Sequence, residues 1–229
     1  MTINGWEISE AGAKQVNVVW GYSVINPRSV WVGGSPTPVL INPQAGFKPL
    51  QIVLSVNGNG RNEIRDNISF LLSKMTGILD IQMDGFLNSF RGTLKNYTAE
   101  ELSKKRWHKV TLNLEGYEYG DLVTANDTEE VEVENTGTAE TPVRIEVSSS
   151  VALGSTVISC TETGWSITLP GVASGSAAII DGETGLVTQN GVLLAAVFTE
   201  LPTVMPGVAH FTASNPGADL TVKFNPRYL

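Results

Sequence analysis

Residues 61–77, RNEIRDNISFLLSKMTG, constrain the fold most, because they form the one segment of the chain with a clear helical period. Phe70 falls about 120° around the helix from Ile64, outside the arc shared by the other apolar side chains, so it is expected to widen the core contact or to face another molecule. Gly77 predicts a left-handed end of the helix. At about 100° per residue, the apolar side chains that share one arc and predict a helix lying on a sheet are Ile64, Ile68, Leu71, Leu72 and Met75.

The two halves of the chain differ in charge. Residues 1–125 hold 12 Lys or Arg and 11 Asp or Glu, whereas residues 126–229 hold 3 and 12, so the net charges are +1 and −9. A chain of 229 residues with 41% hydrophobic content can bury two modest cores. We therefore predict an N-terminal α+β domain over 1–125 and a C-terminal domain over 126–229, and the acidic half speaks against nucleic acid as its partner.

Few side chains could support catalysis or hold a metal. Cys160 is the single cysteine, which excludes an internal disulfide, and the two histidines, His108 and His210, leave few bases for a nucleophilic triad. The same residues are too few for a zinc site. We therefore expect no catalytic, cofactor-binding or metal-binding residues, and no enzyme.

No targeting or membrane-spanning segment is expected. The opening residues, MTINGWEISE, have no basic region followed by an apolar run, and the longest apolar stretch, 192–198, is far shorter than a membrane span. The chain is therefore expected to be made in the cytoplasm.

Two stretches near the helix could be mistaken for ligand sites. A strand over 50–56 enters the helix through 57–60, NGNG, but Glu63 occupies the third glycine position of a dinucleotide site and would repel a pyrophosphate. The basic run at 104–109 is short and isolated, whereas phosphate binding takes several spread contacts. We interpret the first as a tight turn and the second as the solvated flank of a hairpin.

The rest of the N-terminal half is expected to be β-structure. Asp84-Gly85 is a strong signal for a two-residue hairpin turn. The expected strands are 16–20, 29–32, 38–41, 50–56, 78–83, 86–94 and 107–114.

From Val131 onward, alternating strands recur about every ten residues with turns between them, which is typical of an antiparallel β-sandwich. The fold class predicted for the whole chain is therefore mainly β with one principal helix. The strands expected in this half are 131–134, 143–147, 156–160, 165–169, 177–180, 186–188, 192–199, 208–212 and 219–224.

Asp181 and Glu183 could suggest a glycosidase pair or a cation site. However, two acids in one turn lie on the same small loop, whereas an acid and a base must flank the bond from separate positions. The ligand count also falls short of an EF-hand. We interpret Asp181, Gly182 and Gly185 as a structural turn in which Asp181 accepts backbone N–H groups.

Several stretches together resemble siphophage distal tail proteins. The helix segment and WHKVTLNLEGYEYGD are similar to their N-terminal half, and VENTGTAETPVRIEV, AAIIDGETGLVTQNG, ELPTVMPG and DLTVKFNPRYL resemble their C-terminal, galectin-like half. The resemblance spans almost the whole chain. Its strongest stretch is 181–185, supported by 201–207 and 223–228.

This resemblance implies a structural protein of the virion at the phage tail tip. The 1–125 domain would close a hexameric ring around the DNA channel, with Phe70 as a candidate subunit contact, and the 126–229 domain would be a galectin-like sandwich that projects outward. The implied partners are further copies of the chain, the tail tube protein, the tail-associated lysin or host-binding protein and the tape measure protein, with no cofactor, no membrane and no sequence-specific binding of nucleic acid.

A carbohydrate-binding β-sandwich that contacts the host surface is the alternative function. Such a module needs an exposed aromatic side chain on which a sugar can stack. The aromatic candidates in the sandwich, most of them expected to point inward, are Trp165, Phe198, Phe211, Phe224 and Tyr228.

Overall fold

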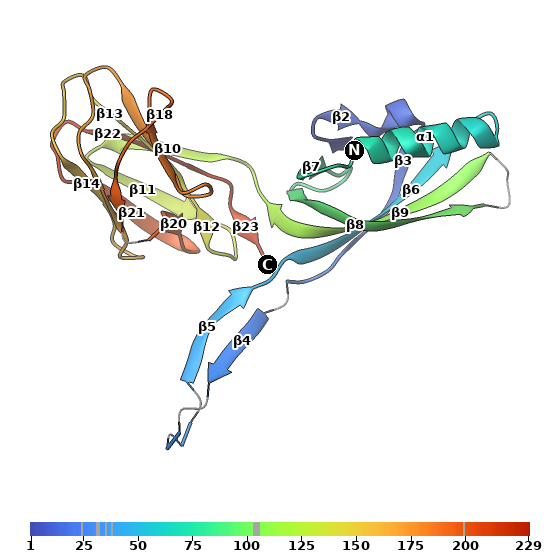
Figure 1. Ribbon diagram of the computed structural model, residues 1–229, viewed down its shortest axis with the longest axis horizontal. Helices are drawn as coiled ribbons and strands as arrows, with labels where there is room; N and C mark the ends of the chain where they lie inside the picture. The colour runs from blue at the N-terminus through green and yellow to red at the C-terminus, as the bar shows by residue number, and fades with distance from the viewer. Residues whose placement is uncertain (24, 31–32, 35, 38, 103–105, 199) are drawn as a thin grey trace. The chain divides into compact units, whose positions relative to one another are not determined.

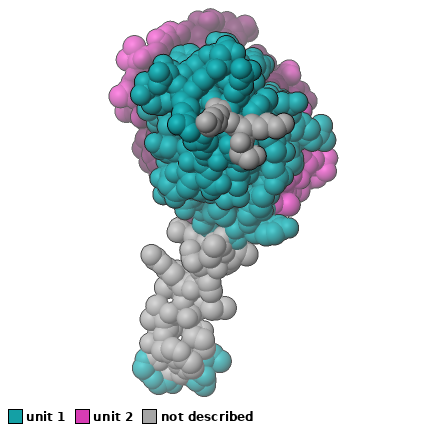
Figure 2. Space-filling view, turned by 90° about the vertical axis from the view of Figure 1, so that its right-hand side faces the viewer, with its two compact units in different colours: residues 1–119, 229 teal, residues 120–228 magenta. Residues whose placement is uncertain are grey.

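The computed structural model describes residues 1–23, 25–30, 33–34, 36–37, 39–102, 106–198 and 200–229. The chain forms two compact units, Met1–Tyr119 together with Leu229, and Gly120–Tyr228 (Figure 2). The boundary expected after residue 125 falls inside β10 (Val123–Thr128), which pairs along its whole length with β22 (Asp219–Phe224). This ladder ties residues 123–128 to the second unit, so the division comes after Tyr119.

The first unit is built on one antiparallel sheet with the strand order β2-β1-β7-β8-β9-β6-β3 (Figure 1). A short 3-10 helix, η1 (Ile8–Ala11), connects β2 to β3, and β4 (Ile25–Val30) pairs with β5 (Val39–Ala45) in a two-stranded sheet. The bounds of the other strands are β1 (Thr2–Ile3), β2 (Trp6–Glu7), β3 (Ala13–Trp20), β6 (Lys48–Asn57), β7 (Leu79–Gln82), β8 (Ser89–Glu101) and β9 (Trp107–Tyr119).

The helix α1 (Arg61–Ser73) packs the predicted apolar stripe onto this sheet. It ends at Ser73 rather than at Gly77, because the N–H groups of Lys74 and Met75 bond to the carbonyls three residues earlier and tighten the last turn. Gly77 does adopt the left-handed conformation, with φ 78°, but in the turn that follows. The apolar positions of α1 that enter the core are Ile64 and Leu71, which are buried, and Ile68 and Leu72, which are partly buried; Met75, two residues past the end of the helix, is also buried in this core.

Two expectations for the first unit are wrong in detail. A turn forms at Asp84-Gly85, where the Phe86 N–H bonds to the Met83 carbonyl at 3.4 Å, but the whole connection from β7 to β8 takes residues 83–88. The backbone of Asp84 bonds to the Gln15 side chain at 2.9 Å rather than continuing the ladder. β8 also continues through Glu101, since residues 98–101 pair with β9. The strands expected over 29–32 and 38–41 lie partly outside the described residues.

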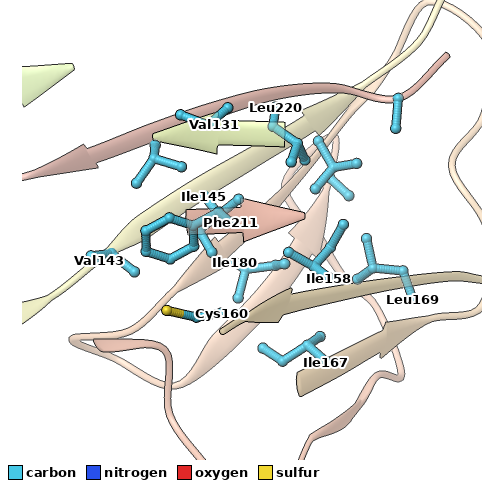
Figure 3. Packing of buried hydrophobic residues seen from close by; sticks show 14 of the residues in the cluster. Val131, Val143, Ile145, Ile158, Cys160, Ile167, Leu169, Ile180, Phe211 and Leu220 are labelled. Atoms are coloured by element: carbon cyan, nitrogen blue, oxygen red, sulfur yellow. The ribbon is translucent and has the colours of Figure 1, made fainter. Parts of the chain in front are cut away.

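The second unit is a β-sandwich. Its six-stranded sheet has the order β10-β22-β13-β16-β17-β18, and its five-stranded sheet has the order β11-β21-β14-β15-β19. Apolar side chains from both sheets form one core between them (Figure 3). In this core the ring centroids of Trp165 and Phe211 lie 5.7 Å apart. The remaining strands are β11 (Glu130–Asn135), β12 (Thr141–Pro142), β13 (Arg144–Ser148), β14 (Thr156–Cys160), β15 (Ser166–Leu169), β16 (Ala177–Asp181), β17 (Leu186–Gln189), β18 (Val192–Leu193), β19 (Val197–Phe198), β20 (Thr203–Val204), β21 (Gly207–Ala213) and β23 (Arg227–Tyr228).

The single strand expected over 192–199 is wrong. This stretch forms β18 and β19, which are the last strands of different sheets. The chain changes sheets because Leu194 and Ala196 turn toward the core between them. Residue 199 lies outside the described residues.

Candidate functional site

Phe70 lies on the outer side of α1, where its side chain is 41% exposed. Its ring packs edge-on against Trp6 with 5.5 Å between the ring centroids, and Lys74 Nζ lies 5.2 Å from the Phe70 centroid. Trp6 Nε1 donates a hydrogen bond to Glu10 Oε2 at 2.9 Å, which fixes the indole. We call Trp6, Phe70 and Lys74 the Phe70 patch. It is a partly exposed aromatic surface beside the core of the first unit.

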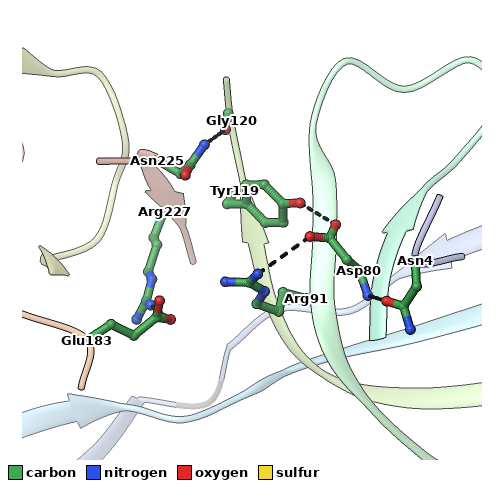
Figure 4. Close-up of polar contacts among 8 residues, drawn as sticks. All are labelled: Asn4, Asp80, Arg91, Tyr119, Gly120, Glu183, Asn225 and Arg227. Atoms are coloured by element: carbon green, nitrogen blue, oxygen red, sulfur yellow. Dashed lines mark hydrogen bonds and ion pairs between the residues drawn. The ribbon is translucent and has the colours of Figure 1, made fainter. Parts of the chain in front are cut away.

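Asp181, Gly182 and Gly185 lie together in the turn between β16 and β17. Asp181 Oδ1 accepts hydrogen bonds from the backbone N–H groups of Glu183 at 2.9 Å and Thr184 at 3.1 Å. The Gly185 N–H bonds to the Asp181 carbonyl at 2.8 Å, and Gly185 has φ 71°, which favours glycine. Glu183 instead pairs with Arg227, at 3.0 Å (Figure 4). The two carboxylates therefore serve different partners and do not flank a common site.

The stretches that carry the sequence resemblance in this half meet at the same turn. The Gly182 N–H bonds to the Val143 carbonyl at 2.9 Å, and a Cβ added at Gly182 would lie 2.2 Å from the carbonyl oxygen of Pro202. The carbonyl of Arg227 accepts hydrogen bonds from the N–H groups of residues 138 and 139, at 2.9 and 3.1 Å. Residues far apart in the sequence thus build one end of the sandwich.

Asn135, which was not predicted as a site residue, stabilises this end of the sandwich through buried hydrogen bonds. It is only 2% exposed. Its Nδ2 donates to the carbonyls of Ala139 and Val204 at 3.3 and 3.2 Å, and its Oδ1 accepts from the Gly137 N–H at 3.0 Å. A buried polar side chain is stable only when its groups are paired in this way, so Asn135 holds β11, β20 and the following loop in one arrangement.

His210 on β21 forms a second polar cluster that sequence reasoning missed. Its Nδ1 lies 2.6 Å from Glu162 Oε1, its backbone N–H donates to Glu162 Oε2 at 2.8 Å, and its Nε2 lies 3.5 Å from Glu132 Oε2. Partial desolvation opposes ionisation of Glu162, but the hydrogen bonds from the side chain and backbone of His210 lower its pKa to about 2. The side-chain hydrogen bond to Glu162 raises the pKa of His210 above its ordinary value.

In the first unit, Tyr119 at the end of β9 is tied to Asp80 on β7. The Tyr119 hydroxyl donates to Asp80 Oδ1, Arg91 Nη2 lies 3.6 Å from Asp80 Oδ2, and the Asp80 N–H donates to Asn4 Oδ1 at 2.7 Å (Figure 4). Burial raises the pKa of Tyr119 to about 12, and the hydrogen bond to Asp80 acts in the same direction. This network fixes the end of β9 against β7.

The aromatic side chains of the sandwich do not form a platform for a sugar. Trp165, Phe211 and Phe224 are buried in the core, and Tyr228 is half-buried. Phe198 on β19 is 44% exposed. One exposed ring on an edge strand is less than a carbohydrate site ordinarily offers, since such sites combine aromatic stacking with converging polar groups.

Within the described part of the chain, no group of three or more His, Cys, Asp or Glu side chains is placed to hold a metal ion. Over the same residues, no helix is long and apolar enough to cross a membrane.

The fold as a whole matches solved structures of phage tail proteins. The Dit protein of phage SPP1, described as a paradigm of the hub adsorption apparatus in phages that infect Gram-positive bacteria, matches with a TM-score of 0.76 and 18% identity over 99% of this chain and 98% of that chain. Two structures of the phage P2 baseplate in its activated conformation, one with Ca and one with Sr, match with a TM-score of 0.48 and 11% identity over 96% of this chain and 92% of theirs.

No protein-family model matches the sequence, and the search of curated proteins gives no match. The fold is therefore the property that this chain shares with known proteins. It confirms the sequence resemblance at that level: the chain has the fold of a siphophage distal tail protein.

Proposed function

We propose that this chain is a structural component of a siphophage tail tip, where six copies close a hub ring that joins the tail tube to the host-binding or baseplate proteins. The observation that carries the proposal is the similarity to the SPP1 hub protein over nearly the full length of both chains. Both units and their order along the chain are shared, which a chance likeness of one common β-module would not give.

The charge of the two units supports a ring formed through the first. Residues 1–119 hold 12 Lys or Arg and 10 Asp or Glu, whereas residues 120–228 hold 3 and 13, a net charge of −10. Copies of the second unit would repel one another at close range, although salt screens this repulsion beyond roughly 10 Å. Near-neutral first units can pack side by side, so ring assembly is assigned to them.

The Phe70 patch is the subunit contact in this proposal. Buried aromatic anchors contribute most to protein interfaces, and Phe70 keeps 41% of its surface exposed although Trp6 packs edge-on against it and Lys74 lies over its ring. Lys74 lies over the ring and would form an ion pair with a carboxylate of the neighbouring copy.

The other proposed partners are the tail tube protein, the tail-associated lysin or host-binding protein, and the tape measure protein. The protein would act in the virion after synthesis in the cytoplasm of the host bacterium. Its role is non-enzymatic and needs no cofactor, since the polar clusters described above are all engaged in holding strands and turns together.

The proposal is tested by light scattering and electron microscopy of the purified full-length protein. Wild type should give six-fold rings, and Phe70→Ser should weaken each contact by about 1–2 kcal/mol, which accumulates around a ring. Tyr22→Ser is the matched control, because Tyr22 is an exposed aromatic residue (84%) of the same unit that lies outside the patch. A wild-type protein that stays monomeric at high concentration contradicts the ring, and unchanged assembly of Phe70→Ser contradicts the assigned contact.

A further inference from the structure

The second unit carries an exposed apolar strip at residues 192–198, VLLAAVF. Four of its side chains face solvent: Val192 is 70% exposed, Leu193 69%, Val197 76% and Phe198 44%. The strip has no charged or polar side chain, and it runs from β18, the last strand of the six-stranded sheet, to β19, the last strand of the five-stranded sheet. It therefore occupies the edge of both sheets at once.

The opposite edge of the same sandwich is built differently. There the last strands are β10 and β11, and β11 presents the exposed carboxylates of Glu130, Glu132 and Glu134. Charged side chains on an edge strand are a common device that prevents pairing with another chain. One edge of the sandwich is thus protected against strand addition, and the other lacks charge and proline over its whole length.

Charge decides which kind of molecule fits the unprotected edge. The three cations of the second unit are engaged inside it: Arg144 and Lys223 pair with Glu146 at 3.4 and 3.0 Å, and Arg227 pairs with Glu183 at 3.0 Å. The carboxylates that these cations do not pair include Glu200, which is exposed two residues beyond Phe198. The second unit of another copy, with its own net charge of −10, is disfavoured, whereas a segment with basic ends is attracted.

We propose that the apolar strip binds an extended apolar segment of another protein, with basic residues at its ends, which adds as a strand to the edge of β19. In β19, Val197 and Phe198 pair with Thr168 and Ile167 of β15 on one side only, within the described residues. Strand addition would supply backbone partners on the other side, while Val197 and Phe198 would be covered by alternate side chains of the incoming segment. The proposal rests on the second unit alone and does not depend on ring assembly.

The test measures binding of labelled peptides to the full-length protein by fluorescence anisotropy. The probe is a short peptide of alternating valine and threonine with lysines at both ends. One comparison peptide carries glutamates at its ends, and another is N-methylated at alternate residues so that it cannot form a β-ladder. The protein variants are Val197→Lys and the control Val151→Lys, which adds the same charge at a 60% exposed valine of the same unit outside the strip.

The lysine-ended peptide should bind wild type and Val151→Lys equally, and bind Val197→Lys at least about tenfold more weakly. The glutamate-ended and N-methylated peptides should also lose about tenfold or more. Absence of binding to wild type, equal binding to Val197→Lys, or an equal loss with Val151→Lys would overturn the proposal. Light scattering on the same samples gives a separate result: a fall in mass with Val197→Lys alone would show that a second copy occupies the strip, which also overturns it.

Discussion

Replacing Gly182 with alanine should strongly destabilise the second unit. An ideal Cβ at this position would lie 2.2 Å from the carbonyl oxygen of Pro202 and 2.8 Å from that of Val143. Both atoms belong to backbone that is already paired, because the Gly182 N–H bonds to the Val143 carbonyl at 2.9 Å and the Val143 N–H bonds to the Pro202 carbonyl at 3.1 Å. The clash can be relieved only by moving backbone and weakening these bonds.

The magnitude follows from the two costs. Forcing an extra methyl group into a packed site costs about 1–3 kcal/mol, and each of the two weakened backbone hydrogen bonds costs about 1 kcal/mol, so the free energy of unfolding should fall by about 3–5 kcal/mol. Gly185→Ala should cost less, about 1–2 kcal/mol, because its φ of 71° is unfavourable for alanine but the neighbouring atom is the mobile end of the Leu201 side chain. Gly154→Ala is the matched control, since a Cβ there meets nothing within 4 Å and the change should stay within about 0.5 kcal/mol.

The assay must report on the second unit alone. Hydrogen exchange of peptides from β13, β16 and β22, followed in increasing urea, gives the free energy of unfolding of this unit separately from that of the first. The expected order of destabilisation is Gly182, then Gly185, then Gly154. If Gly182→Ala were no more destabilising than Gly154→Ala, the close packing of the turn against residues 201–203 would be refuted.

Three further predictions concern charge and assembly. The pair of His210 and Glu162 should stabilise the second unit most between about pH 4.5 and 6.5. The raised pKa of His210 adds stability below its ordinary 6.5, which is lost as the pH rises through the folded value, and the lowered pKa of Glu162 adds stability above its ordinary 4.5, which is lost as the pH falls toward 2. His210→Gln should therefore flatten the decline of stability above pH 6.5, as measured by urea titrations. Lys48→Met should destabilise the first unit by about 1–3 kcal/mol in thermal unfolding, because it leaves the half-buried Glu118 without its cation. Lys95→Met, which breaks the exposed pair with Glu115, should cost less than about 1 kcal/mol. Equal effects of the two substitutions would contradict the argument from the difference in burial. Because each unit has its own core, fragments 1–119 and 120–229 should both fold. Light scattering should find the assembled species in the first fragment. A monomeric first fragment beside an oligomeric second fragment would contradict the proposal that the first unit forms the ring.

The regular elements could be predicted from the sequence because each depends on a local period. The stripe from Ile64 to Met75 buries one face of α1, and the alternation of β13, β16 and β22 places every second residue in the core of the sandwich. The end of α1 was misplaced because the last turn is tightened by hydrogen bonds that leave no signal in the residue types. The strand expected over 192–199 was wrong because an all-apolar run has no alternation to show where the chain changes sheets.

The sites depend on contacts between distant residues, which a period does not encode. Asp181 could be placed in a structural turn from its own neighbourhood, but its packing against Pro202 and the pairing of Glu183 with Arg227 join segments that only the fold brings together. Phe70 could be recognised as lying off the helix stripe, whereas its ring contact with Trp6 needed the path of η1 across the helix. The pairing of His210 with Glu162 could not be predicted because the two residues lie 48 positions apart in the sequence.

The ion pairs of the two units also favour a particular kind of assembly. In the first unit cations and carboxylates largely neutralise one another, with Lys48 on Glu118, Lys95 on Glu115 and Lys109 on Glu100. In the second unit the three Lys and Arg side chains pair with two glutamates, Glu146 and Glu183, and the unit keeps a net charge of −10. Contacts between first units therefore carry little electrostatic penalty, whereas contacts between second units carry a large one at short range. The ring proposed above, closed by contacts between first units, satisfies both conditions.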